Sequence, residues 1–147
     1  MKIMKVEITN LQKKIKINNS LIRKAILHTL KSEKCSQDAQ VSVAIVANSK
    51  IKQLNSTYRD KSFVTDVLAF PMEEEKFPKI SSSILGEVVI SAESAKIQAK
   101  NMNIPFDEEM IRLAVHGTLH LLSYTDTSTC DAERMTTRQE QLVRELV

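Results

Sequence analysis

Two of the three histidines in this 147-residue sequence, His116 and His120, lie four residues apart in the stretch HGTLHLLSYTD. On a helix, residues i and i+4 lie on the same face one turn apart, so both imidazoles could bind one ion. Imidazole suits zinc, nickel or copper better than magnesium or calcium. If the helix ends near Ser123 or Tyr124, the chain can fold back and bring Asp126 to the same ion. Two imidazoles and one carboxylate leave a position open for water, which is typical of a catalytic metal site.

The alternative for this stretch is an apolar helix whose two histidines are hydrogen-bonded core residues. Glycine usage favours the metal site, because Gly86 and Gly117 are the only two glycines of the chain. A glycine inside a helix costs about 1 kcal/mol relative to alanine, so Gly117 predicts the close approach of a ligand or another backbone. Gly117 also argues against an HExxH peptidase, because the general base of that class is a glutamate at this position. The third histidine, His28, is expected to be an ordinary core or surface residue.

The elements that must position these residues alternate between strands and helices. Period-two or β-branched patterns predict strands over residues 3–9, 40–48, 65–71 and 84–91. Helical patterns predict helices over residues 18–34, 49–59, 92–103 and 108–123, and a last helix from 128 or 129 to the C-terminus. The predicted N-caps of the first four helices are Ser20, Asn48, Ser91 and Asp107. The charged, serine-containing segment 72–83 is expected to be an exposed loop.

These elements predict one α/β domain over residues 1–147, with a small mixed four-stranded sheet and about five helices. The order strand, helix, strand across residues 40–71 predicts a right-handed crossover between parallel strands. The third and fourth strands are expected to pair as an antiparallel hairpin.

Composition and charge limit the class of protein. Hydrophobic residues make up 42% and charged residues 27%, as in ordinary globular proteins. No apolar run approaches the roughly 18 residues that span a bilayer, and the N-terminus lacks a signal-peptide pattern, so a cytoplasmic location is expected. Cys35 and Cys130 belong to no CxxC pair and are expected to be reduced. Residues 1–34 hold nine Lys or Arg against two Glu, a net +7 that could face RNA or belong to a solvated helix.

Three separated segments resemble signatures of the YbeY-type endoribonucleases, bacterial proteins that act on ribosomal RNA. HGTLHLLSYTD is similar to HGxLHLxGYDH, LNSTYRDKSFVTDVLAFP (54–71) to LNxxYRxxxxPTDVLSFP, and LGEVVIS (85–91) to LGDIxIS. The resemblance implies an α/β fold, one zinc ion held by three histidines, and cleavage of single-stranded RNA. It also implies roles in maturation of the small-subunit rRNA 3′ end and in ribosome quality control.

Carried over to this sequence, the resemblance implies that His116 and His120 are the first two metal ligands. It further implies catalytic roles for His116 and for Arg59, whose guanidinium can hold a phosphate oxygen and stabilise developing charge. The alternative for Arg59 is a structural ion pair with Asp66. Nothing in the sequence selects a general base, and Glu87 is only a guess.

The sequence departs from the family pattern at the third metal ligand, where Asp126 replaces a histidine. Aspartate can ligate zinc, so we expect His116, His120 and Asp126 to hold one Zn²⁺, with another divalent metal possible. A two-histidine site with waters and an empty site are the alternatives. Ser123 replaces the glycine that would ease the turn off the helix, and Val64 replaces a proline.

The expected function is that of a metal-dependent, single-strand-specific endoribonuclease in rRNA processing. Its expected partners are RNA and the ribosome or its small subunit, without a membrane, and it is expected to be a monomer. The alternative is a non-catalytic ribosome-associated RNA-binding or assembly factor with a degraded metal site. Another metal-dependent hydrolase is a weaker possibility.

Overall fold

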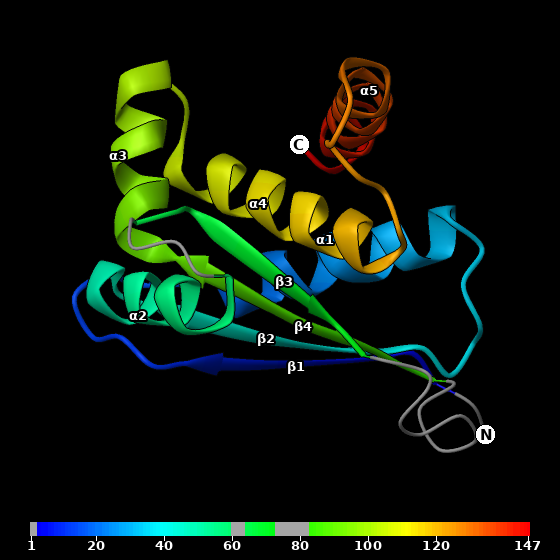
Figure 1. Ribbon diagram of the computed structural model, residues 1–147, viewed down its shortest axis with the longest axis horizontal. Coiled ribbons are helices and arrows are strands. Elements are labelled where there is room, and N and C mark those ends of the chain that lie inside the picture. The colour runs from blue at the N-terminus through cyan, green and yellow to red at the C-terminus, as the bar shows by residue number, and fades with distance from the viewer. Residues whose placement is uncertain (1–2, 60–63, 73–82) are drawn as a thin grey trace.

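The computed structural model describes residues 3–59, 64–72 and 83–147, and its strands form one mixed sheet (Figure 1). The strands are β1 (Lys5–Asn10), β2 (Gln40–Val46), β3 (Val67–Pro71) and β4 (Ile84–Ser91). Their spatial order is β1-β2-β4-β3, with β1 and β4 parallel to β2 and β3 antiparallel to β4. The predicted mixed four-stranded sheet and the antiparallel pairing of the third and fourth strands are therefore confirmed.

The predicted parallel crossover from the second strand to the third is wrong. β4 lies between β2 and β3, parallel to the first and antiparallel to the second, so β2 and β3 run in opposite directions. The parallel neighbours are β1 with β2 and β2 with β4. A helix between two strands does not reveal that a later strand will be inserted between them.

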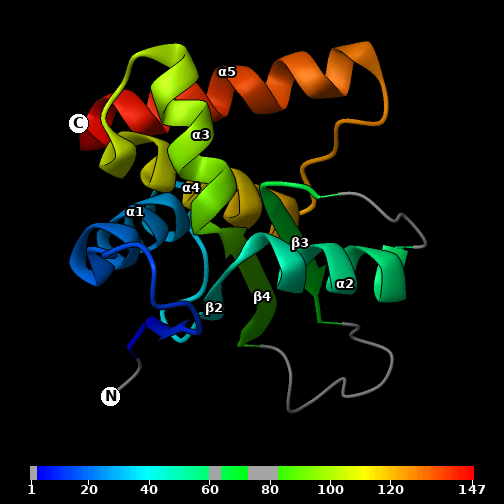
Figure 2. The same ribbon diagram turned by 90° about the vertical axis from the view of Figure 1, so that its left-hand side faces the viewer.

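Five helices lie in the described residues, as predicted. They are α1 (Asn19–Ser32), α2 (Asn48–Arg59), α3 (Ala92–Met102), α4 (Phe106–Leu121) and α5 (Thr129–Leu146). α1 and α4 cover one face of the sheet, α2 covers the other, and α5 lies over α4 on the side away from the sheet (Figures 1 and 2). Within the described ranges, no helix is long and apolar enough to cross a membrane.

The central strands are buried on both faces, which explains their continuous apolar sequences. Val88 and Ile90 of β4 belong to the main core, together with residues of α1, α4 and α5. Val89, between them, faces the opposite way and packs with Val46 and Ile51 beneath α2. This alternation follows from the period of two along a strand.

The N-terminal ends of α2 and α3 meet at one cluster of polar side chains. The Ser91 hydroxyl accepts a hydrogen bond from the Ser94 amide at 3.2 Å and caps α3, as predicted. Asn48 does not cap α2 but is its first residue, and its side-chain oxygen accepts from the Ser94 hydroxyl at 2.8 Å. The polar side chain at this helix start therefore joins two helices instead of capping its own.

Two other predicted caps are wrong. Asn18, not Ser20, caps α1 by accepting from the Leu21 amide. Pro105 occupies the N-cap position of α4, so Asp107 lies in the first turn, where its charge still favours the helix dipole. The last helix begins at the predicted place. The predicted loop 72–83 lies, apart from its two end residues, outside the described residues.

Candidate metal centre

Close packing of α4 against the sheet places the two histidines. A Cβ added to Gly117 would lie 2.5 Å from Val88 Cγ1 and 3.3 Å from Val67 Cγ2, so only glycine fits without rearrangement. A close approach at Gly117 is confirmed. The nearest atoms are side-chain atoms of β3 and β4, not the backbone of another element.

The two imidazoles face each other across one helical turn. His116 Nε2 and His120 Nε2 are 3.1 Å apart. On the other side of each ring, His116 Nδ1 lies 2.7 Å from Gln139 Oε1, and His120 Nδ1 lies 3.0 Å from the Tyr124 carbonyl oxygen. Oxygens of these two kinds only accept hydrogen bonds, so each Nδ1 holds the hydrogen and donates it. In its neutral form, each ring then presents a lone pair at Nε2.

Two lone pairs facing each other repel unless a cation lies between them, so this donor set fits a metal ion. Two ligands about 2.1 Å from a tetrahedral zinc ion lie about 3.4 Å from each other, close to the observed separation of the nitrogens. The ligand atoms of His116, His120 and Asp126 all lie within 4.8 Å of one another. The three residues predicted from the sequence are therefore brought together, in a cluster that could bind a metal.

The surroundings of His120 favour its neutral form. Burial lowers its pKa, and the neighbouring His116 and the charge of Arg59 lower it further, against the opposing effects of Tyr124 and Asp126. A neutral imidazole is the form that binds metal ions.

The turn after α4 brings Asp126 to the histidines. The Tyr124 amide donates to the Leu119 carbonyl at 3.0 Å, and the Ser123 amide donates to the His120 carbonyl at 3.1 Å. These two bonds form a Schellman motif, in which the residue at Ser123 is usually glycine. Ser123 adopts the corresponding left-handed conformation, with φ 76°. The predicted reversal of the chain is confirmed, and it uses serine where the family pattern has glycine.

Tyr124 anchors this reversal to the rest of the fold. Its hydroxyl donates to Glu33 Oε1 at 2.7 Å, and Arg138 Nε donates to Glu33 Oε2 at 2.8 Å. The hydrogen bond to Glu33 raises the pKa of Tyr124. The residue whose carbonyl orients His120 is thus fixed at its side chain by the C-terminal end of α1 and by α5.

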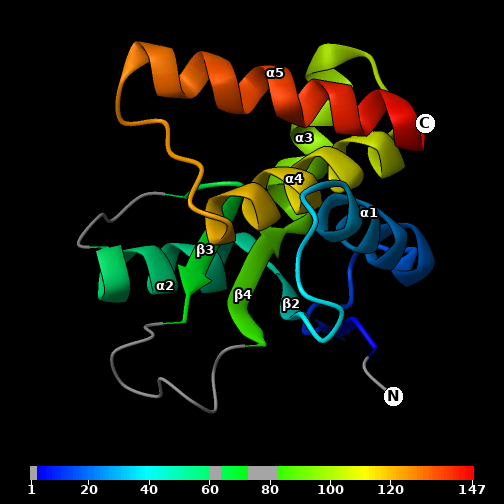
Figure 3. The same ribbon diagram turned by 90° about the vertical axis from the view of Figure 1, so that its right-hand side faces the viewer.

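The candidate ligands open into a cleft of about 650 Å³, a volume within the usual range for ligand sites. The connection from α4 to α5 runs beside β3 (Figure 3), and residues of both segments line this cleft. The end of α2 also lines the cleft and contributes Arg59, which is exposed. His116, His120, Asp126 and Arg59 therefore share one cleft.

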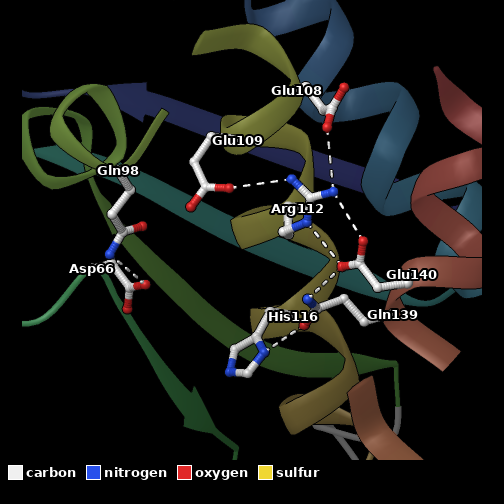
Figure 4. A network of polar contacts seen from close by, with 8 residues as sticks. All are labelled: Asp66, Gln98, Glu108, Glu109, Arg112, His116, Gln139 and Glu140. Atoms are coloured by element: carbon white, nitrogen blue, oxygen red, sulfur yellow. Dashed lines mark hydrogen bonds and ion pairs between the residues drawn. The ribbon is translucent and has the colours of Figure 1, made fainter. Parts of the chain in front are cut away.

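The proposed alternative partner of Arg59 makes other contacts. In the described part of the chain, Asp66 accepts a hydrogen bond from Gln98 Nε2 at 3.1 Å (Figure 4) and another from the Thr65 hydroxyl at 3.5 Å. Asp66 lines the cleft but forms no ion pair with Arg59 there. Glu87, the guessed general base, is exposed on β4 and does not line this cleft.

Sequence reasoning missed the residues that orient the histidines. Gln139 lies 23 residues after His116 on a different helix, and no motif spacing connects the two. Glu33 lies still farther away, 91 residues before Tyr124. Such contacts arise only when α1, α4 and α5 have packed.

Comparison with known proteins identifies the family. The family described as Endoribonuclease YbeY matches residues 7–147. Endoribonuclease YbeY of Alkaliphilus metalliredigens is 39% identical over 144 residues, covering 95% of this chain and 93% of the relative. Endoribonuclease YbeY of Carboxydothermus hydrogenoformans is 38% identical over 143 residues, covering 95% and 96%.

A solved structure agrees with this relationship. The solution structure of TM1509 from Thermotoga maritima aligns with a TM-score of 0.65 and 26% sequence identity, over 96% of this chain and 88% of that one. The match to the family begins within β1 and covers the other three strands, both histidines of α4 and the whole of α5. The chain therefore belongs to the endoribonuclease YbeY family.

Proposed function

We propose that residues 1–147 form one metal-dependent domain that cleaves single-stranded RNA and acts in rRNA processing and ribosome quality control. The observation that supports this best is the pair of Nε2 atoms 3.1 Å apart, which open with Asp126 into the cleft that contains Arg59. The names of the relatives supply the reaction class. The preference for single strands and for the small-subunit rRNA 3′ end rests on the family resemblance.

In this proposal, His116 and His120 hold a zinc ion through Nε2, and Asp126 completes the ligand set. When bound, the ion would act as a Lewis acid toward a phosphoryl oxygen. Arg59 binds the same phosphate through its guanidinium and stabilises the negative charge that develops during cleavage. Zinc is the proposed metal because two imidazoles and one carboxylate form a common catalytic zinc site.

The proposed partners are single-stranded RNA and the small ribosomal subunit. In this proposal the protein is a monomer and acts in the cytoplasm. The basic residues of the first 34 positions would add phosphate contacts that do not depend on sequence. The C-terminal end of α1 is the part of this region that is joined to the site, because Glu33 contacts Tyr124.

The test begins with protein purified without a metal-affinity tag, whose bound metal is measured by mass spectrometry. Cleavage of a single-stranded oligoribonucleotide and of its duplex is then compared among wild type, His116→Ala and Arg59→Met. His28→Ala is the matched control for histidine, because its Nε2 lies 2.8 Å from Glu145 in a separate contact. Lys52→Met, exposed on the same helix, is the control for Arg59.

We expect zinc in wild type, loss of zinc and activity in His116→Ala, and retained zinc with reduced cleavage in Arg59→Met. Both controls should behave as wild type. Wild type that contains no metal and cuts RNA no faster than His116→Ala would overturn the enzyme proposal. RNA binding without cleavage would then favour the non-catalytic assembly factor, whose motivation is the altered third ligand.

A further inference from the structure

A chain of polar contacts runs from His116 on α4 to Gln139 and Glu140 on α5 and returns to Arg112 on α4 (Figure 4). Gln139 of α5 is the first member, with its amide oxygen 2.7 Å from His116 Nδ1. Its amide nitrogen donates to Glu140 Oε2 at 3.0 Å. Both ends of one side-chain amide are therefore engaged, one toward the candidate metal centre and one away from it.

Glu140 is itself held by a bidentate ion pair. Arg112 Nε donates to Glu140 Oε2 at 2.8 Å, and Arg112 Nη2 donates to Glu140 Oε1 at 2.9 Å. Arg112 also contacts Glu108 and Glu109, each at 3.3 Å, and its side chain is only 19% exposed. The hydrogen bonds from Arg112 lower the pKa of Glu140 and keep its carboxylate ionised.

An ionised carboxylate decides which way the Gln139 amide points. A carboxylate accepts hydrogen bonds and donates none, so the NH₂ group of Gln139 must face Glu140. The amide oxygen then faces His116, where it can only accept. Nδ1 of His116 must consequently hold the hydrogen, and the lone pair remains on Nε2, which faces Nε2 of His120. The direction of each bond follows from the one before it.

We propose that Gln139 is a positioning residue that fixes the tautomer and the ring orientation of His116, with Glu140 and Arg112 fixing Gln139 in turn. The inference rests on the proposed function for its purpose, because a fixed Nε2 lone pair matters only if it binds a metal. His120 has the same arrangement with a different acceptor, the Tyr124 carbonyl. A backbone acceptor remains when side chains are replaced, so His120 serves as an internal reference.

The test compares Gln139→Met with Gln141→Met, an exposed position on the same helix. Long-range ¹H–¹⁵N NMR of the metal-free proteins at about pH 8, where imidazole is mostly neutral, reports the tautomer of each ring. We expect wild type and Gln141→Met to hold His116 in the Nδ1–H form. Gln139→Met should show a mixture of tautomers at His116 and an unchanged His120.

Zinc affinity provides the second readout, measured by competition with a chromophoric chelator. Loss of such an outer partner typically weakens metal binding about 10- to 100-fold, and we expect Gln139→Met to fall in this range. The exchange Q139E together with E140Q places a carboxylate acceptor against His116 Nδ1 and an amide donor at position 140 that faces this carboxylate. The double variant should therefore bind zinc more tightly than Gln139→Met and recover most of the wild-type affinity. A thermal unfolding curve checks that each variant is folded.

A His116 ring that stays in the Nδ1–H form in folded Gln139→Met, with wild-type zinc affinity, would overturn the inference. Failure of the proposed function gives a different result. In that case wild type would bind no zinc, while the tautomer of the metal-free protein would still show whether Gln139 orients His116.

Discussion

The candidate metal centre has two parts that are built differently. His116 and His120 on α4 form its helix half, and Asp126 in the connection between α4 and α5 forms its loop half. His116 and His120 lie on α4, partly buried, and each Nδ1 is engaged by a fixed oxygen. Asp126 is exposed in the connection between α4 and α5. On α5, Arg138 helps to hold Tyr124 through Glu33, and the adjacent Gln139 contacts His116 directly.

The difference explains where this sequence departs from its family. Replacing His116 or His120 would remove its contact with Gln139 or with the Tyr124 carbonyl and disturb the packing of α4. Asp126 is exposed in the connection, so a change there disturbs less packing. The departure at Asp126 falls in the exposed loop half. We infer that the contacts around a ligand determine how accurately it is placed as much as its chemical type does.

The largest effect should separate the two halves directly. We expect His120→Ala to weaken zinc binding at least about 100-fold, beyond the usual loss of an outer partner. Asp126→Ala should weaken it less, about 10-fold, because water can replace an exposed carboxylate. Both constants are measured by chelator competition. Asp126→His, which restores the residue of the family pattern, should bind zinc at least as tightly as wild type. Equal losses in His120→Ala and Asp126→Ala would contradict the division into halves.

A second effect concerns the packing that places the helix half. Gly117→Ala should destabilise the fold by about 1–3 kcal/mol, because the added methyl would lie 2.5 Å from Val88 Cγ1. Urea unfolding measures the change. In a Val88→Ala background, which removes the obstructing methyl groups, Gly117→Ala should cost clearly less. An equal cost in both backgrounds would show that another contact, not this clash, determines the choice of glycine.

Local patterns in the sequence were sufficient to predict the helix half of the site and most helices and strands. The spacing of His116 and His120 predicts their shared face because helix geometry is fixed by the backbone alone. The order of strands was not predictable in the same way, since the insertion of β4 between β2 and β3 depends on long-range pairing. Gln139 was missed for the same reason, because its contact with His116 exists only after α5 packs on α4.

The smallest effect lies in the turn that begins the loop half. Ser123 has φ 76°, a left-handed conformation that costs an L-residue about 1–2 kcal/mol. Ser123→Gly removes this strain. Glycine also gives the unfolded chain more conformational freedom, which lowers the free energy of unfolding by about 0.4–1 kcal/mol. We therefore expect Ser123→Gly to stabilise the fold by about 0.5–1 kcal/mol in urea unfolding.

Ser123→Ala is the matched control, because alanine keeps the Cβ that causes the strain and removes only the hydroxyl. It should gain no stability, and stabilisation equal to that of Ser123→Gly would show that the φ angle is not the source. Zinc affinity should stay within about threefold of wild type in both variants, because the Schellman bonds from Ser123 and Tyr124 use backbone atoms only. A larger change in affinity would mean that the side chain at this turn, and not only its backbone, positions Asp126.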